Sequence, residues 1–294
     1  MRLGAVFPQT EAGTDIDAIA DYIQNVESLG FHHILAFDHV LGANAASRAN
    51  WSGAYQHTDS FYEPLTFYSY AAGITNRLEL ATGVIILPQR QTALFAKQSA
   101  TLDLISGGRL RLGIGTGWNQ VEYEALGENF HNRGKRSEEQ INLLRKLWSQ
   151  ELISFKGKYH TVTDAGLNPL PPRRSIPIWF GGMADPVLER VAKIGDGWLP
   201  LGSPDKEKKN KFDLLKKYLE QNSRSMNDIG IEAMISQKNS DSDTDIKKDL
   251  SSWAQIGATH ISINTMNCGL KFPGEHIKAL SNFCLLYTSD AADE

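Results

Sequence analysis

The sequence predicts an α/β fold, a (β/α)8 TIM barrel with loop insertions. Short apolar runs of strand length alternate along the chain with longer stretches of helical period, in about eight pairs, and eight such pairs close a parallel barrel. Gly30, Gly195 and Gly257 each end a predicted helix shortly before the next predicted strand, as glycine readily does. A doubly wound open sheet shares the alternation. Even units without a break in composition favour the barrel.

Each predicted strand is a short apolar run bounded by polar residues or glycine. The eight runs are 3–7, 32–37, 78–86, 109–115, 177–181, 197–201, 229–236 and 260–264. Each predicted helix instead places apolar residues three and four positions apart, as Ile19, Ile23 and Val26 show in the first one. The predicted helices are 15–30, 63–75, 91–106, 136–150, 185–195, 205–222, 245–257 and 274–283.

Two long segments interrupt this rhythm. Residues 42–61 are polar, and residues 152–177 contain a predicted hairpin at 154–162 followed by a proline-rich extended linker. Long loops on a barrel commonly shape the entrance to the active site. We therefore expect both segments to influence which substrate is accepted.

The last eleven residues, 284–294, continue neither the period nor the composition of the helix over 274–283. They match the translation of a transposon-based sequencing adapter. We therefore expect a single native domain over residues 1–283, a non-native tail over 284–294, and a last barrel helix that is cut short at Phe283. A frayed native terminus is the alternative.

Composition excludes several classes of protein. Lys+Arg 30 against Asp+Glu 34 gives a formal net charge of -4, which leaves no basic excess for nucleic acid or an anionic membrane. No apolar run approaches the roughly 20 residues that cross a bilayer, and the first residues lack the apolar segment of a signal peptide. Cys268 and Cys284 are too few for a disulfide framework or a cysteine-rich metal site. We expect a cytoplasmic enzyme that binds neither nucleic acid nor membrane.

In a parallel barrel the active site lies at the C-terminal ends of the strands. Asp38 and His39 follow the predicted strand 32–37 directly. An imidazole exchanges protons near neutral pH, and a neighbouring carboxylate can fix its tautomer. The alternative is a surface histidine beside a helix-capping aspartate. His32 and His33 lie at the opposite end of that strand, where we interpret them as structural.

No metal site is predicted. The remaining histidines show no ligand-like spacing with one another: they are His57, His131, His160, His260 and His276.

The segment from Pro177 to Arg190 combines a strand end with a helix start. Gly181 and Gly182 lack side chains, so main-chain N–H groups there can approach a ligand closely. Asp185 suits an N-cap and Pro186 the first helical position, and free amides at a helix N-terminus attract an anion such as a phosphate. The alternative is a tight glycine-rich connection without a ligand.

The segment Gly113–Trp118 begins like a dinucleotide-binding fingerprint, but Trp118 occupies the place of the third glycine. It also belongs to the fourth unit, whereas that fingerprint opens its fold. We therefore expect the small residues to let a flat ring lie against the barrel mouth, with Trp118 as a wall.

Taken together, six segments resemble the luciferase-like family of flavin- and deazaflavin-dependent oxidoreductases. They are AFDHV, LATGVIILPQR, SATLDLISGGRLRLGIGTGW, ISFKGKYH, PIWFGG and GDGW. The similarity runs from Leu3 to about Phe283, and the DHV and TGV segments are most similar to the branch that uses the deazaflavin coenzyme F420. This resemblance implies a barrel that holds the flat ring of F420 or FMN at the strand C-termini.

The resemblance also implies roles for single residues. His39 would lie beside the reactive ring face as proton donor or acceptor, with Asp38 supporting it. Gly83 and Val84 match the family's non-proline cis peptide, which backs the ring.

Thr116 and Gly117 would border the ring. The family's phosphate-holding loop matches three consecutive residues, Gly181, Gly182 and Met183. Some F420-dependent dehydrogenases carry a glutamate directly after the Thr-Gly pair, where this chain has Trp118, which weighs against a sugar-phosphate substrate. Glu122, one helical turn further on, either replaces that acid or is simply solvated.

The expected function is hydride exchange between coenzyme F420 and a small organic substrate. One alternative is an FMN-dependent monooxygenase that receives reduced flavin from a flavin reductase. Another is a non-catalytic flavin-binding protein. Dimers are common in the family, so a homodimer is one expected assembly.

Overall fold

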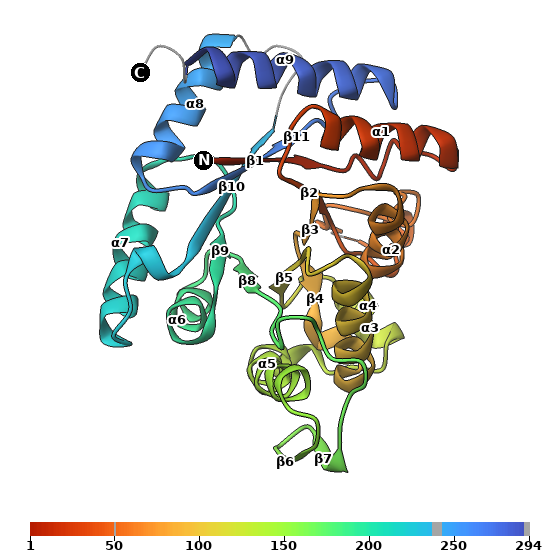
Figure 1. The fold of residues 1–294 in the computed structure, drawn as a ribbon, viewed down its shortest axis with the longest axis vertical. Helices are drawn as coiled ribbons and strands as arrows, with labels where there is room; N and C mark the ends of the chain where they lie inside the picture. The colour runs from red at the N-terminus through yellow and green to blue at the C-terminus, as the bar shows by residue number, and fades with distance from the viewer. Residues whose placement is uncertain (50, 237–242, 291–294) are drawn as a thin grey trace.

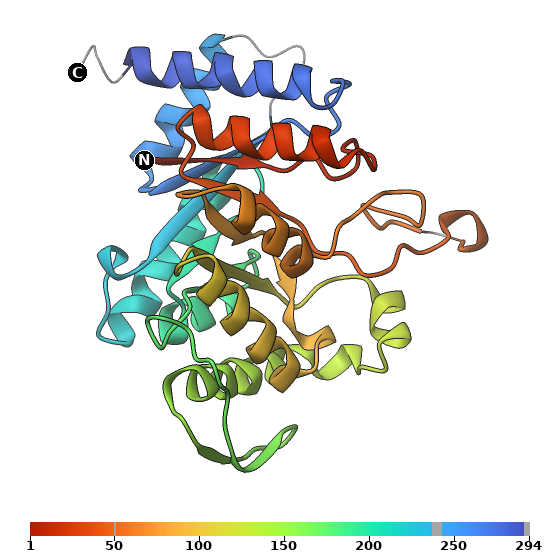
Figure 2. The same ribbon diagram turned by 45° about the vertical axis from the view of Figure 1, so that its right-hand side comes forward.

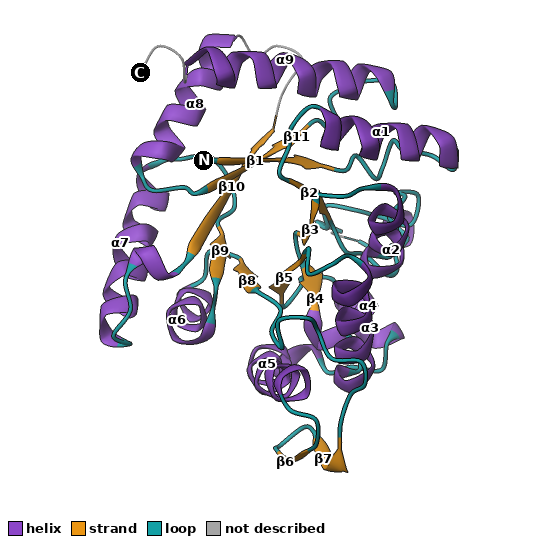
Figure 3. Ribbon diagram, viewed as in Figure 1, coloured by secondary structure: helices purple, strands orange, loops and turns teal. Residues whose placement is uncertain are grey.

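A ring of parallel strands surrounded by helices forms the core of the computed structural model, which describes residues 1–49, 51–236 and 243–290 (Figures 1 and 3). The strands follow the order β3-β2-β1-β11-β10-β9-β8-β5-β4, and a further pairing of β3 with β5 closes the ring. Every pairing within this ring is parallel. The barrel predicted from the sequence is therefore confirmed, and the open sheet is excluded.

The barrel strands fall where the apolar runs predicted them, with one division. Their bounds are β1 (Arg2–Val6), β2 (His33–Ala36), β3 (Glu79–Thr82), β4 (Ile85–Ile86), β5 (Leu110–Gly115), β8 (Ile178–Gly181), β9 (Gly197–Leu199), β10 (Gly230–Ser236) and β11 (His260–Asn264). The single run predicted over 78–86 is split into β3 and β4, because the chain departs from strand geometry at Gly83 and Val84. Counting β3 and β4 as one strand gives the eight of the barrel.

The helices lie outside the strands (Figure 3), and buried apolar side chains of most of them belong to the same core cluster as those of the strands. Their bounds are α1 (Ile16–Ser28), α2 (Pro64–Ile74), α3 (Thr92–Ile105), α4 (Gln120–Ala125), α5 (Arg133–Ser149), α6 (Asp185–Ile194), α7 (Lys206–Gln221), α8 (Asp243–Gln255) and α9 (Gly274–Asp290). Helix α1 begins where the Asp15 carboxylate accepts hydrogen bonds from the amides of Asp17 and Ala18. Helix α4 is an element that the sequence analysis missed.

Both predicted interruptions lie outside the barrel. The hairpin consists of β6 (Ile153–Lys156) and β7 (Thr161–Ala165), which pair antiparallel beyond α5 (Figure 1). The segment between β2 and α2 extends away from the barrel body (Figure 2). Of that segment, Asn50 lies outside the described residues.

Helix α9 runs without a break across Phe283, where the predicted native domain ends. Tyr287 lies in the continuation and exchanges hydrogen bonds of 2.9 Å with the main chain of Met1, and α9 lies beside α1 (Figures 1 and 2). The non-native origin of 284–294 stays a prediction, and residues 291–294 lie outside the described part of the chain.

A cluster of charged and polar side chains fills part of the barrel interior. Glu232 receives hydrogen bonds from Arg111, Ser262 and His33, whose Nε2 lies 2.7 Å from the Glu232 carboxylate. Burial alone would raise the pKa of Glu232, but the adjacent Arg111 and His33 hold it well below its usual range. Gly4 makes room for the ring, since a Cβ there would lie 2.0 Å from His33 Nε2. His33 is thus a buried structural residue, as the sequence suggested.

Candidate active site

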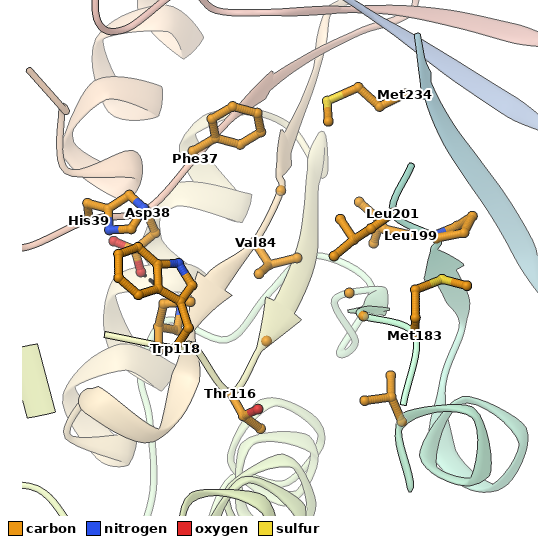
Figure 4. A pocket seen from close by; sticks show the side chains of 18 of the residues that line it. Phe37, Asp38, His39, Val84, Thr116, Trp118, Met183, Leu199, Leu201 and Met234 are labelled. Carbon is orange, nitrogen blue, oxygen red and sulfur yellow. Dashed lines mark hydrogen bonds between the residues drawn. The ribbon is translucent and has the colours of Figure 1, made fainter. Parts of the chain in front are cut away.

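A cavity of about 500 Å³ opens at the C-terminal ends of the strands. All ten residues that the sequence analysis singled out as site candidates line it: Asp38, His39, Gly83, Val84, Thr116, Gly117, Trp118, Gly181, Gly182 and Met183. They come from the ends of four barrel strands that are far apart in the sequence. Asp38, His39 and Trp118 lie on one side of the cavity, Met183 on the other, and Val84 between them (Figure 4).

His39 is held by a buried carboxylate that comes from α4. Its Nδ1 lies 3.3 Å from Glu122 Oε1, while no hydrogen bond among the described residues involves Nε2. The side chain of His39 is only 13% exposed, which excludes the surface histidine considered above, and that of Glu122 is 1% exposed. Glu122 is therefore not solvated. Burial alone would raise its pKa, but the hydrogen bonds from His39, Gln89 and main-chain amides lower it, so the carboxylate stays ionised at neutral pH.

Asp38 does not hold His39, contrary to the expectation from the sequence. Its carboxylate accepts hydrogen bonds from Arg90 Nη2 at 2.8 Å and from the amide of Ile86 at 2.9 Å. Burial raises the pKa of Asp38, with Arg90 opposing that rise. Because consecutive side chains diverge at the end of a strand, Asp38 points to the wall at β4. Asp38 thus forms a buried ion pair with Arg90 in the wall of the cavity, and Glu122, instead of Asp38, contacts His39.

Aromatic side chains surround the imidazole of His39. Its ring centroid lies 4.9 Å from that of Tyr55, 4.7 Å from Phe61 and 5.8 Å from Trp118. Tyr55 and Phe61 come from the long segment between β2 and α2, as expected of a loop at the entrance, whereas no residue of the other long segment, 152–177, lines the cavity. A second hollow of about 290 Å³ adjoins the first and shares His39, Tyr55 and Asn119 with it.

The Gly83–Val84 peptide is cis, as the family resemblance predicted. Val84 projects into the cavity (Figure 4), and two glycines make room for it. A Cβ on Gly115 or on Gly181 would lie 2.6 Å from a methyl group of Val84, and real side chains do not approach so closely. Gly181 is thus required by the neighbouring side chain.

The start of α6 differs from the sequence prediction. The N-cap is Ala184, so Asp185 is the first helical residue, and the side chain of Asp185 contacts Lys211 Nζ at 2.7 Å instead of capping the helix. Gly182 adopts φ +123°, which only glycine adopts readily. Within the described structure the amides of Met183, Ala184 and Asp185 have no hydrogen-bond acceptor, and Met183 and Ala184 line the cavity. These amides form a feature suited to an anion.

Thr116, Gly117 and Trp118 form the edge of the cavity after β5. Tyr123 Oη donates a hydrogen bond of 2.7 Å to the carbonyl of Thr116. Gly117 has φ +66°, and a Cβ there would lie 2.7 Å from Ile86. Trp118 stands beside His39 as a wall and is 42% exposed.

The sequence analysis missed several residues that line the cavity: Leu35, Phe37, Tyr55, Leu199, Leu201, Glu232, Met234 and Ser262. Leu199 and Leu201 lie at the C-terminal end of the predicted strand 197–201, so their place in the run was a usable signal. Glu232 and Ser262 lie inside β10 and β11, and no sequence pattern marks them.

The described residues contain no group of three or more His, Cys, Asp or Glu side chains that could hold a metal ion. No helix among them combines the length and apolar character that membrane crossing requires.

Two solved structures share the fold at low sequence identity. A monooxygenase from Streptomyces bottropensis superposes with a TM-score of 0.78 at 19% identity, over 99% of this chain and 100% of that one. A coenzyme F420-dependent tetrahydromethanopterin reductase from Methanopyrus kandleri gives a TM-score of 0.72 at 16% identity, over 95% and 97% of the two chains.

The relatives found by sequence include one named for FMNH2 and one named for F420. An uncharacterised protein of Mycobacterium tuberculosis is 36% identical over 49% of this chain and 50% of its own. An FMNH2-dependent dimethylsulfone monooxygenase of Pseudomonas fluorescens is 29% identical over 79% of this chain and 61% of its own. An F420-dependent glucose-6-phosphate dehydrogenase of Amycolatopsis mediterranei is 27% identical over 62% of this chain and 52% of its own.

The matched part thus spans about half to three-fifths of each relative. A family model described as luciferase-like monooxygenase matches residues 1–266, which include every residue that lines the cavity. The chain is therefore a member of the luciferase-like monooxygenase family.

Proposed function

We propose that the protein exchanges a hydride between coenzyme F420 and a small organic substrate, with His39 as the proton donor or acceptor. The observation that carries this proposal is the hydrogen bonding of the two ring nitrogens of His39 beside the cavity. One ring nitrogen is held by buried Glu122, and the other has no hydrogen-bond partner among the described residues. Hydride transfer to a carbonyl carbon requires a proton for the oxygen, and an imidazole so placed is suited to supply it.

The residues present fit a flat redox ring with an anionic tail. The cavity of about 500 Å³ is within the range of small-molecule sites, and most side chains that line it are apolar. The unpaired amides at Met183, Ala184 and Asp185 would hold a phosphate at one end. Val84 and Leu199 would contact the ring near the middle, and His39 lies on the far side (Figure 4).

The cofactor, when bound, supplies or receives the hydride, and it is oxidised when the substrate is reduced. The protein contributes the proton and the environment. His39 Nε2 would give a proton to the substrate oxygen in the reducing direction and take it back in the other. Tyr55, Phe61 and Trp118 would exclude water from the imidazole.

An FMN-dependent monooxygenase is the second candidate. It is favoured by the Pseudomonas fluorescens relative, which matches more of this chain than the F420-dependent relative does. This reaction would use reduced FMN delivered by a flavin reductase and would consume oxygen. A non-catalytic flavin-binding protein is the remaining alternative.

Anaerobic titration of the protein with coenzyme F420 and with FMN, each oxidised and reduced, tests the cofactor. We expect tight binding of F420 and its reoxidation by members of a panel of short-chain ketones and aldehydes. Binding of reduced FMN alone, with oxygen uptake when air is afterwards admitted, would replace the first proposal by the second. Binding of neither cofactor would overturn both, and binding without any turnover by the panel would favour the flavin-binding alternative.

A further inference from the structure

Both carboxylate oxygens of the buried Glu122 accept hydrogen bonds. Its Oε1 accepts hydrogen bonds from the amides of Val40 at 2.9 Å and Leu41 at 3.3 Å, in addition to His39 Nδ1. Its Oε2 accepts one from Gln89 Nε2 at 3.1 Å. The carboxylate is thereby fixed on the chain segment that carries the imidazole, and it cannot turn away from it.

These contacts determine where the imidazole carries its proton. An ionised carboxylate only accepts hydrogen bonds, so Nδ1 of His39 must be the nitrogen that bears hydrogen. In the neutral ring the lone pair is then on Nε2, the nitrogen without a partner in the described structure. When the ring is protonated, Nε2 becomes a donor and the carboxylate stabilises the cation. The distance of 3.3 Å is long, as is common at catalytic hydrogen bonds without substrate.

Other titratable groups near His39 do not compete for its nitrogens. The Asp38 carboxylate is bound to Arg90 and Ile86. Asp59 of the adjacent hollow accepts from the amide of Gln56. Tyr55 meets the imidazole through its ring, and among the described residues no hydrogen bond joins His57 to His39.

We propose that Glu122 is a positioning residue, which fixes the Nδ1–H tautomer of His39 and stabilises its protonated form. The proposal deepens the function proposed above and rests on it. Glu122 does not line up with the acid that some F420-dependent dehydrogenases carry after the Thr-Gly pair. It acts on the reaction through His39.

Two variants separate charge from hydrogen bonding. Glu122→Gln keeps an acceptor oxygen and loses the charge, whereas Glu122→Leu loses both. Glu139→Gln is the matched control, because Glu139 also binds a histidine Nδ1 and several main-chain amides, but outside the cavity. Nitrogen-15 NMR of histidine-labelled protein without cofactor reports the tautomer, with His39 assigned from a His39→Gln sample.

In the native protein we expect the neutral His39 ring to be in the Nδ1–H form. In Glu122→Leu we expect a mixture dominated by Nε2–H, and in Glu122→Gln an Nδ1–H proton signal shifted upfield. Glu139→Gln should leave the His39 signals unchanged. An unchanged His39 tautomer in Glu122→Leu would overturn the proposal. If Glu122→Leu does not fold, an unchanged Nδ1–H signal in Glu122→Gln would overturn it equally.

The kinetic arm uses reduced coenzyme F420 and the ketone that the native protein reduces fastest. We expect kcat to fall about tenfold or more in Glu122→Gln, a part of the roughly 10²–10⁴ that proton transfer supplies, with little change in KM. An unchanged kcat would overturn the positioning role. If no ketone is reduced, the proposed function fails, while the NMR result still decides whether Glu122 fixes the ring.

Discussion

Two glutamate–histidine pairs in this molecule are built from the same groups and differ in what lies beyond the ring. In each pair the carboxylate binds Nδ1 and main-chain amides of the histidine's own segment, at the cavity for Glu122 and His39 and at the β6–β7 hairpin for Glu139 and His160. His160 Nε2 is 2.8 Å from the buried hydroxyl of Thr92, whereas His39 Nε2 has no such partner in the described structure.

This difference gives His160 a structural role, called the anchor below, and leaves His39 able to react. Thr92 also receives a hydrogen bond of 3.0 Å from Gln140 Nε2, so both nitrogens of His160 are engaged in joining the hairpin to α3 and α5. A histidine engaged on both sides holds structure. A histidine engaged on one side beside a cavity can exchange a proton with a bound molecule.

The largest expected difference between the pairs is in turnover. His39→Gln should lower the rate of ketone reduction by about 10²–10⁴, because it removes proton transfer, while F420 binding stays within about threefold. His160→Gln should leave turnover unchanged. Steady-state kinetics and fluorescence titration with F420 measure both. Full turnover in His39→Gln would remove the difference between the two histidines.

The next effect concerns Asp38, the carboxylate that the sequence favoured as the partner of His39. Asp38→Asn weakens the hydrogen bonds to buried Arg90 and to the amide of Ile86, and should cost about 1–3 kcal/mol of unfolding free energy. The cost stays below that of a fully isolated pair because Glu63 still binds Arg90 at 2.9 Å. Urea unfolding measures it, with the more exposed Glu63→Gln as a control expected to cost under about 1 kcal/mol. A change of the His39 tautomer in Asp38→Asn would restore Asp38 to the role first assigned to it.

Thr92→Val tests the anchor. The isosteric change leaves His160 Nε2 and Gln140 Nε2 without their hydroxyl partner, so we expect a loss of about 1–2 kcal/mol in unfolding free energy. Turnover and the signals of His39 should not change. The control is Thr101→Val, since the Thr101 hydroxyl only bonds back within α3 at 2.9 Å. Equal losses in the two variants would show that the Thr92–His160 contact stabilises nothing.

The smallest expected difference between the two pairs is in how the unfolding free energy depends on pH in acid. Burial alone would raise the pKa of Glu122 and of Glu139. Hydrogen bonds from His39 and Gln89 instead hold the pKa of Glu122 below the ordinary 4.5. Hydrogen bonds from Tyr159 and His160 do the same for the pKa of Glu139. A lowered folded-state pKa contributes stability that is complete above the unfolded value and is lost as the pH falls through the folded value. The unfolding free energy should therefore fall below about pH 4.5.

Glu122→Gln and Glu139→Gln should each flatten that fall, and Glu122→Gln should flatten it more, because the side chain of Glu122 is 1% exposed against 15% for that of Glu139. Unfolding free energies measured over a pH series give the slopes. Identical slopes in the native protein and both variants would show that neither pair is coupled to folding.

Sequence reasoning succeeded where the signal is local. The strand and helix runs follow from spacing within a few residues, and strand ends such as His39 and Thr116 follow from them. It failed where two local interpretations were equally good. Asp185 suits an N-cap by residue type, yet the chain turns one residue earlier and leaves Ala184 there. The mostly apolar run over 78–86 predicts one continuous strand, although Gly83 and Val84 leave the strand.

Pairings across the barrel were beyond the sequence. His39 and Glu122 are 83 residues apart and meet only because β2 and α4 come together above the same barrel end. Asp38 is the neighbour of His39 in the chain, but its side chain leaves the strand end in another direction and meets Arg90, 52 residues away.

The sequence by itself determined the barrel and the ring of strand ends, because alternating apolar periods decide which faces are buried. Only the tertiary structure decided which carboxylate meets which histidine, and which imidazole nitrogen is left to face a cavity. That choice depends on side-chain directions and on contacts between distant segments, and neither is encoded in the spacing of residues along the chain.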